Sequence, residues 1–116
     1  MSMNGKFYVS LEAARLLKEK GYNEECDCAI DEDGDIYVCE YRMNQDLPKW
    51  KWSCPTKAEA IDWLESNGKI IEVLQDYRGQ WFYVIKEVCV SEDDNTYFST
   101  RLEAEEAAII KALELL

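Results

Sequence analysis

The residues of this sequence that could do chemistry are its carboxylates and cysteines, because histidine is absent. Without histidine the chain has no Ser-His-Asp or Cys-His arrangement, no histidine-bound metal and no ordinary proton shuttle near neutral pH. A cysteine–lysine or paired-carboxylate mechanism remains open in principle, but no spacing points to one. We therefore predict a protein that is not an enzyme, and an enzyme without a recognisable motif is the alternative.

One acidic stretch can be aligned with a calcium-binding loop. In AIDEDGDIYVCE, residues 29–40, the ligands would include Asp31, Asp33 and Asp35. Ala29 then stands at the first ligand position, where an aspartate is needed, and both flanks have strand patterns instead of the helices of an EF-hand. The Asp-Gly pair inside the stretch is typical of a hairpin turn. We interpret the stretch as a charged turn and predict no bound metal or other cofactor.

The cysteines also allow a zinc interpretation. Cys26 and Cys28 lie one residue apart, whereas zinc sites usually use a C-x-x-C spacing. On a strand, a C-x-C spacing places both thiols on one face, which favours burial in a core. A disulfide between Cys28 and Cys39 upon oxidation is left open. The five cysteines are Cys26, Cys28, Cys39, Cys54 and Cys89.

Aromatic residues near lysines suggest contact with a partner. The segment Lys49-Trp50-Lys51-Trp52 alternates with a period of two residues, as a short strand does. Tryptophan beside lysine could stack on single-stranded nucleic acid, but the chain around it is acidic. Aromatic residues are enriched at protein interfaces, so protein contact is the better functional hypothesis, with core packing as the structural alternative.

Acidic clusters recur along the chain, and their simplest interpretation is a solvated surface. The alternative is a DNA mimic, whose carboxylates would copy phosphate spacing and block a nucleic-acid-binding protein. The residues predicted to contact a partner are Trp50, Trp52, Asp33, Asp35, Glu92, Asp93 and Asp94.

Composition sets the class of protein. The 116 residues suffice for one domain, and 47% are hydrophobic, which excludes disorder by composition. With 13 basic and 24 acidic residues, the net charge of −11 disfavours direct binding to nucleic acid. The chain shows neither a signal-peptide pattern nor an apolar run that could span a membrane. We predict a cytoplasmic protein, and a homo-oligomer is possible.

Three helices are predicted from their start signals. One follows Ser10 and ends at Gly21, with Leu11, Ala14 and Leu17 on its apolar stripe. A second follows Thr56, which forms a capping box with Glu59, and its stripe is Ala58, Ile61 and Leu64. A third follows Thr100 and runs to the end of the chain. Its stripe is Leu102, Ile109, Leu113 and Leu116.

Two hairpins are predicted between the helices. Residues 26–31 and 36–41 flank Asp33-Gly34, and a two-residue loop there would place Cys28 opposite Cys39 and Ile30 opposite Tyr37. Residues 70–76 and 80–90 form the second hairpin, around Arg78-Gly79. Short strands are also predicted at 7–9, 49–52 and 96–98, the last after a turn at 91–95.

These elements repeat along the chain. Ser10, Gly21 and Gly34 recur as Thr56, Gly68 and Gly79, at a spacing of about 46 residues. The chain therefore divides into two βαββ units, about 6–48 and 49–91, and a closing βα unit, 92–116. We predict one α+β domain over 1–116, in which three helices pack on a largely antiparallel sheet of about six or seven strands.

Three segments in this order carry a resemblance to a known group of proteins: YVSLEAARLLKEKGYNEEC (8–26), SCPTKAEAIDWL (53–64) and EAEEAAIIKALELL (103–116). In these segments the chain resembles small uncharacterised bacterial proteins associated with prophages and mobile elements. The resemblance implies a bacterial or phage accessory protein, and it carries over no activity or site. The prediction is a non-enzymatic protein-interaction module with an unidentified protein partner.

Overall fold

The helices begin at the predicted hydroxyl residues. The computed structural model describes residues 5–86 and 97–116, with helices α1 (Leu11–Glu19), α2 (Lys57–Ser66) and α3 (Arg101–Glu114). The side chain of each preceding residue, Ser10, Thr56 or Thr100, accepts a hydrogen bond from a backbone N–H in the first turn. These caps satisfy donors that a helix cannot satisfy itself. Short 3-10 helices occur at η1 (Gly5–Phe7) and η2 (Asn44–Asp46).

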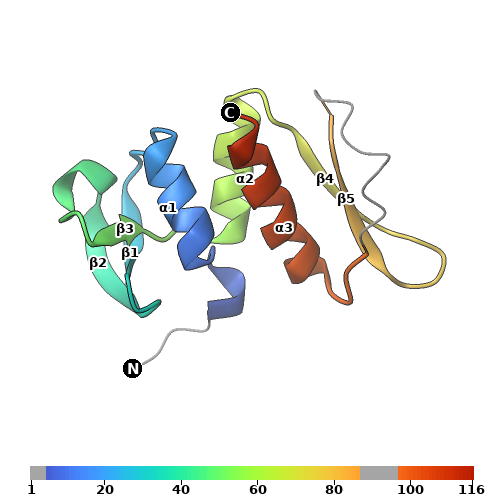
Figure 1. Ribbon diagram of the computed structural model, residues 1–116, viewed down its shortest axis with the longest axis horizontal. Helices are drawn as coiled ribbons and strands as arrows, with labels where there is room; N and C mark the ends of the chain where they lie inside the picture. Colours follow the sequence, from blue (N-terminus) through green and yellow to red (C-terminus); the bar gives the residue numbers. More distant parts are fainter. Residues whose placement is uncertain (1–4, 87–96) are drawn as a thin grey trace.

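The strands form two small antiparallel sheets instead of the predicted single larger sheet. Strands β1 (Cys26–Asp31), β2 (Ile36–Arg42) and β3 (Lys51–Ser53) form one sheet in the order β2-β1-β3. Strands β4 (Ile71–Gln75) and β5 (Trp81–Ile85) form the other. The sheets are separated because the helices lie between them, so the α+β class is confirmed and the single sheet is wrong (Figure 1).

Two of the predicted strands are reduced to isolated bridges. Tyr8 bridges Thr56, so the segments that lead into α1 and α2 pair with each other, and Val9 N–H donates to the Pro55 carbonyl (3.1 Å). Phe98 bridges Trp81, which ties the segment before α3 to β5. The whole of the predicted turn at 91–95 lies outside the described residues, as does Cys89.

The register of the first hairpin differs from the prediction by one residue. Cys28 pairs with Val38 and Ile30 with Ile36, because the loop contains three residues, 32–34, and not two. Gly34 adopts a φ of 85° in this loop. A shift of one residue moves every side chain of a strand to the other face, so Tyr37 leaves the predicted core face and is 46% exposed. The side chains of Cys39 and Tyr41 lie outside the described part.

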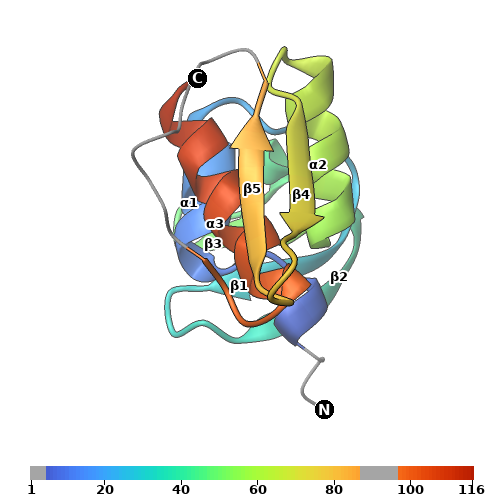
Figure 2. The same ribbon diagram turned by 90° about the vertical axis from the view of Figure 1, so that its right-hand side faces the viewer.

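The helices form the middle of the molecule. Helix α1 packs on the three-stranded sheet, while α3 packs against α1, α2 and the β4–β5 hairpin (Figure 1). Seen from the side of that hairpin, β4 and β5 lie over α3 (Figure 2). Alanine provides much of the contact between helices, because its small side chain lets backbones approach closely. The fully buried alanines of the helices are Ala13, Ala14, Ala60, Ala104, Ala108 and Ala112.

Two of the predicted helix stripes were partly wrong. Ala58 is exposed, and Ala60 takes its place in the core; Leu116 is also exposed, although Leu64, Ile109 and Leu113 are buried as expected. In α2 the buried residues are Lys57, Ala60 and Leu64, spaced three and four residues apart, so the buried face of the helix does not include Ala58.

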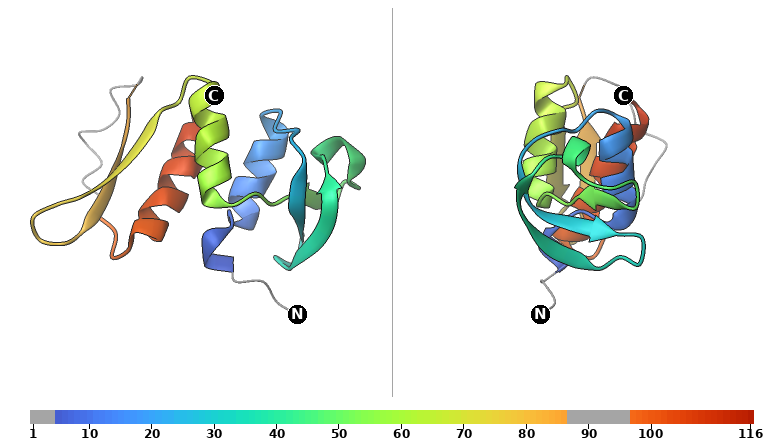
Figure 3. Two further views of the ribbon diagram at one scale, coloured as in Figure 1. Left: turned by 180° about the vertical axis from the view of Figure 1, so that it is seen from behind. Right: turned by 90° about the vertical axis from the view of Figure 1, so that its left-hand side faces the viewer.

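The chain between β2 and β3 crosses the outer face of the three-stranded sheet (Figure 3). Asn44, which is buried, holds this crossing in place. Its Nδ2 donates to the Tyr22 carbonyl (2.7 Å), and its Oδ1 accepts from Ser53 N–H (2.8 Å). The crossing explains why Ala29 is buried although it points away from α1.

Candidate functional site

The turn between β1 and β2 is organised by one aspartate. Asp31 Oδ1 accepts hydrogen bonds from the backbone N–H groups of Asp33 (2.9 Å) and Asp35 (3.0 Å). Gly34 N–H donates to the Asp31 carbonyl (2.9 Å), and Gly34 supplies the positive φ that closes the loop. The backbone of the turn therefore depends on Asp31 and Gly34.

These hydrogen bonds set the charge of Asp31. Burial raises the pKa of its carboxyl, but donation from the Asp35 N–H, the Tyr37 hydroxyl and the Asp33 N–H outweighs burial and lowers the pKa overall. The same hydrogen bond to Asp31, together with burial, raises the pKa of Tyr37. Asp31 is thus an ionised acceptor and Tyr37 a neutral donor near neutral pH.

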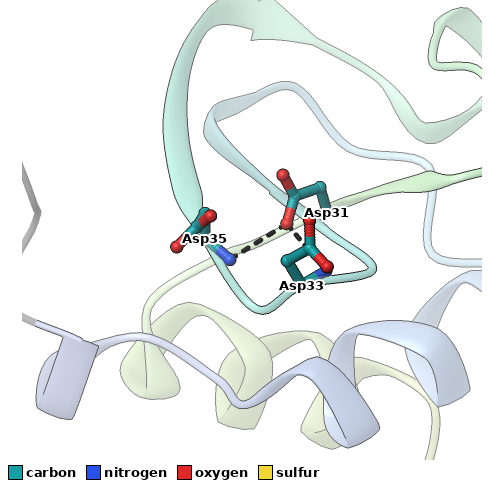
Figure 4. Close-up of side chains that lie close together, drawn as sticks. All are labelled: Asp31, Asp33 and Asp35. Carbon is teal, nitrogen blue, oxygen red and sulfur yellow. Dashed lines mark hydrogen bonds between the residues drawn. The ribbon is translucent and has the colours of Figure 1, made fainter.

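Asp33 and Asp35 lie at the turn with exposed side chains. Carboxylate oxygens of Asp31, Asp33 and Asp35 lie within 4.8 Å of one another (Figure 4). Calcium takes about six to eight oxygen ligands, and one oxygen of Asp31 already binds the turn backbone. The three carboxylates by themselves do not make a metal site, and what they present outward is negative charge.

Pairing of β3 with β1 brings a tryptophan to this turn. Lys51 pairs with Asp31 across the strands, and its Nζ lies over two rings, 4.9 Å from the centroid of Trp50 and 5.4 Å from that of Tyr37. Both rings are about half exposed, Trp50 at 51% and Tyr37 at 46%. We call Asp33, Asp35, Tyr37, Trp50 and Lys51 together the β1–β2 corner.

The structure thus joins some of the predicted contact residues and separates others. Trp50, Asp33 and Asp35 meet in the corner, whereas Trp52 packs against the core with Arg15 over its ring at 4.8 Å. The predicted residues Glu92, Asp93 and Asp94 lie outside the described residues.

Sequence reasoning missed two members of the corner, Tyr37 and Lys51. A two-residue loop at Asp33-Gly34 predicts that Tyr37 lies on the core face. The loop contains three residues, which places Tyr37 on the opposite face. Lys51 was seen only as a neighbour of the tryptophans, because its pairing with Asp31 depends on β3 lying beside β1. The register of β3 has no local signal in the chain.

Cys26, Cys28 and Cys54 are buried, and the thiol of Cys54 is not activated. Cys54 Sγ donates to the Val9 carbonyl (3.4 Å), and burial is the main cause that raises the pKa of this thiol to about 12. A thiol with such a pKa is protonated at neutral pH and is a poor nucleophile and a poor metal ligand. Cys26 and Cys28 are also buried, both in β1.

An open groove beside α3 carries charges that hold the fold together. This groove, about 610 Å³, has mainly apolar walls that include Phe98, Leu102 and Ile110. Of its charged residues, Lys57 is buried and its Nζ donates to the Lys6 carbonyl, while Glu106 accepts from Ser10 N–H (2.9 Å) and Oγ–H (2.8 Å). These two charges are engaged within the protein instead of being presented to a substrate.

No protein-family model, curated protein or solved structure matches this chain. Within residues 5–86 and 97–116, every helix is too short or too polar to cross a bilayer. The function must therefore be inferred from the geometry of the sites themselves.

Proposed function

We propose that this protein is a non-enzymatic, cytoplasmic protein-interaction module that contacts its partner through the β1–β2 corner. The observation that carries the proposal is the pair of half-exposed rings, Trp50 and Tyr37, which both lie close to the Lys51 ammonium at the turn that holds Asp33 and Asp35. Its resemblance to prophage-associated bacterial proteins suggests a host or phage protein as the partner.

Physical chemistry favours this corner as an anchor. Tryptophan and tyrosine supply large contact area, and such residues contribute much of the binding energy at protein interfaces. Both rings are already positioned by Lys51, and Tyr37 is also held by Asp31, so little side-chain freedom remains to be lost on binding. The carboxylates of Asp33 and Asp35 would lie at the rim, where charge sets orientation and association rate.

A comparison of two variants tests the proposal. Trp50→Ala removes a ring from the corner, and Tyr77→Ala removes a ring that is 95% exposed in the β4–β5 turn. Tagged wild-type and variant chains would be used to capture proteins from bacterial lysate, with quantitative mass spectrometry of what is retained. We expect a specific partner to bind wild type and Tyr77→Ala alike and to be reduced about tenfold or more by Trp50→Ala.

Three outcomes would contradict the proposal. One is equal retention of the partner by Trp50→Ala, and another is the recovery of no specific partner at all. The third is capture of a nucleic-acid-binding protein that duplex DNA displaces, with no loss in Trp50→Ala. That result would replace the corner with an acidic DNA-mimic surface.

A further inference from the structure

A second, smaller groove lies away from the β1–β2 corner. The connection from α1 to β1 passes beside α2 (Figure 3), and a groove of about 300 Å³ opens between them. The rings of Tyr22 and Trp63 meet edge to face in it, with centroids 5.4 Å apart and planes at 69°. We call this site the α2 groove. Its acidic lining residues are Glu24, Glu25, Glu59 and Asp62.

The charges of the α2 groove are not neutralised from within the chain. Among the described residues, no lysine or arginine forms an ion pair with any of the four carboxylates. Glu59 Oε1 accepts from Thr56 N–H (2.9 Å) and Oγ–H (3.0 Å), which are bonds of the helix cap. Like charges that converge on one concave surface raise the local concentration of cations.

A buried phenol adds a polar group that the fold does not use. The Tyr22 side chain is only 4% exposed, and it lines the groove. In the described part of the chain no hydrogen bond reaches its hydroxyl, and this oxygen is not among the fully buried unpaired atoms, so it keeps contact with solvent. Burial is the largest cause of a raised pKa at Tyr22, followed by the electrostatic influence of Cys26, Glu59 and Glu24, so the hydroxyl stays neutral and its oxygen can accept a hydrogen bond.

We propose that the α2 groove binds an organic cation, namely an ammonium or guanidinium group carried on an alkyl chain. The ring of Trp63 offers an apolar face and a cation–π contact, the carboxylates offer opposite charge, and the Tyr22 oxygen offers an acceptor. A hydrated metal ion would use only the carboxylates and would leave the aromatic surface and the phenol unoccupied. The proposal goes beyond the β1–β2 corner and does not depend on it.

Such a cation could be a free polyamine or a basic side chain of another protein, and a titration can separate the two. Spermidine and a lysine-containing tripeptide amide of the same charge would be added to the full chain at low salt, with 1H–15N NMR as the readout. We expect saturable shifts of the Trp63 indole N–H and of the Glu24 and Glu25 amides. The tighter of the two ligands identifies the source of the cation.

Matched variants distinguish the groove from general attraction to an acidic protein. Glu25→Gln/Asp62→Asn removes two charges from the groove, while Asp33→Asn/Asp35→Asn removes two from the corner. The first pair should weaken binding about tenfold and the second less than about twofold. Tyr22→Phe, which keeps the ring in the core, should weaken binding about threefold.

Equal weakening by the two double variants would show diffuse electrostatic attraction and would overturn the proposal. The proposal would also be overturned if magnesium chloride, added at the same concentration of positive charge as spermidine, produced the same chemical-shift changes. Chemical-shift changes that do not saturate would overturn it as well. Circular dichroism of each variant confirms that its fold is unchanged, and the corner variant leaves the groove residues intact.

Discussion

The turn between β1 and β2 and the turn between β4 and β5 have the same backbone design. In the second turn Asp76 Oδ1 accepts from the N–H groups of Arg78 (2.9 Å) and Gln80 (3.0 Å), as Asp31 does in the first. Gly79 N–H donates to the Asp76 carbonyl (3.1 Å), and its φ of 85° equals that of Gly34. Both turns are therefore built by an aspartate followed three residues later by glycine.

The side chains between these fixed positions differ. Arg78 donates from Nε (3.1 Å) and Nη2 (3.0 Å) to Asp76 Oδ2, so the second turn neutralises its own charge. The first turn places Asp33 at the position of Arg78 and Asp35 at that of Gln80. Since the second turn forms without acidic residues at these positions, the fold does not require Asp33 and Asp35. Their exposed carboxylates are therefore part of the corner without being needed to build the turn.

The helix caps of the two units differ as well. Thr56 is completed by Glu59 from its own first turn, in a capping box. Ser10 has alanine at the corresponding position, and Glu106 of α3 supplies the carboxylate to its N–H and Oγ–H. The N-terminal cap of α1 is therefore completed by α3, a helix about 90 residues further along the chain.

The largest expected effect on stability comes from this difference in capping. Glu106→Ala removes two charge-assisted hydrogen bonds from a partly buried position and should lower the free energy of unfolding by about 2 kcal/mol. Glu59→Ala, at an exposed position, should cost about 1 kcal/mol or less. Urea unfolding followed by circular dichroism measures the free energy of unfolding of both variants. An equal loss in the two variants would show that the two caps contribute equally to stability.

The glycines should respond alike if the turns share one backbone. Gly34→Ala and Gly79→Ala each force a side chain into the left-handed region, which costs about 1 kcal/mol. An added Cβ meets nothing within 4 Å at Gly34 and only Gln75 Nε2 at 3.8 Å at Gly79, so contact strain should not separate them. The free energy of unfolding of each variant is measured against wild type. If the losses in the two variants differ by more than about 1 kcal/mol, the two turns are not equivalent.

The smallest effect should come from the residues that distinguish the turns. Asp33→Asn/Asp35→Asn should change the free energy of unfolding by less than about 0.5 kcal/mol, because neither exposed side chain has a part in building the turn. Asp31→Ala removes the acceptor of both amides and should lower the urea midpoint clearly more. A double variant as unstable as Asp31→Ala would mean that the acidic pair is structural.

Local signals in the sequence were sufficient for the elements but not for their assembly. Ser10, Thr56 and Thr100 each cap a helix as predicted, because capping depends on residues within one turn. The loop length at Gly34 was misjudged because an Asp-Gly pair suits both a two-residue turn and a three-residue loop with a positive φ at glycine. That one residue decided which face Tyr37 occupies.

The candidate site was only partly visible for the same reason. Trp50, Asp33 and Asp35 were selected by type and exposure, but their proximity follows from β3 pairing with β1 across 20 residues of chain between Asp31 and Lys51. The α2 groove depends in a similar way on Tyr22 meeting Trp63. Contacts between residues this far apart in the chain depend on tertiary packing. They leave no periodic pattern in the sequence from which they could be predicted.

Asp31 and Asp76 have one structural role in their turns, and a pH titration tests that role most directly. In both turns hydrogen bonds outweigh the effect of burial and lower the carboxyl pKa. A lowered folded-state pKa stabilises the protein above the unfolded value of about 3.9, and this contribution is lost as the pH falls through the folded value.

The measurement follows the amide protons of Asp33, Asp35, Arg78 and Gln80 by 1H–15N NMR as the pH is lowered from 6. We expect all four to shift with midpoints below the ordinary aspartate pKa, and the amides within each turn to share one midpoint. A midpoint at or above the ordinary value in either turn, or an amide of the four that does not respond, would contradict the shared design.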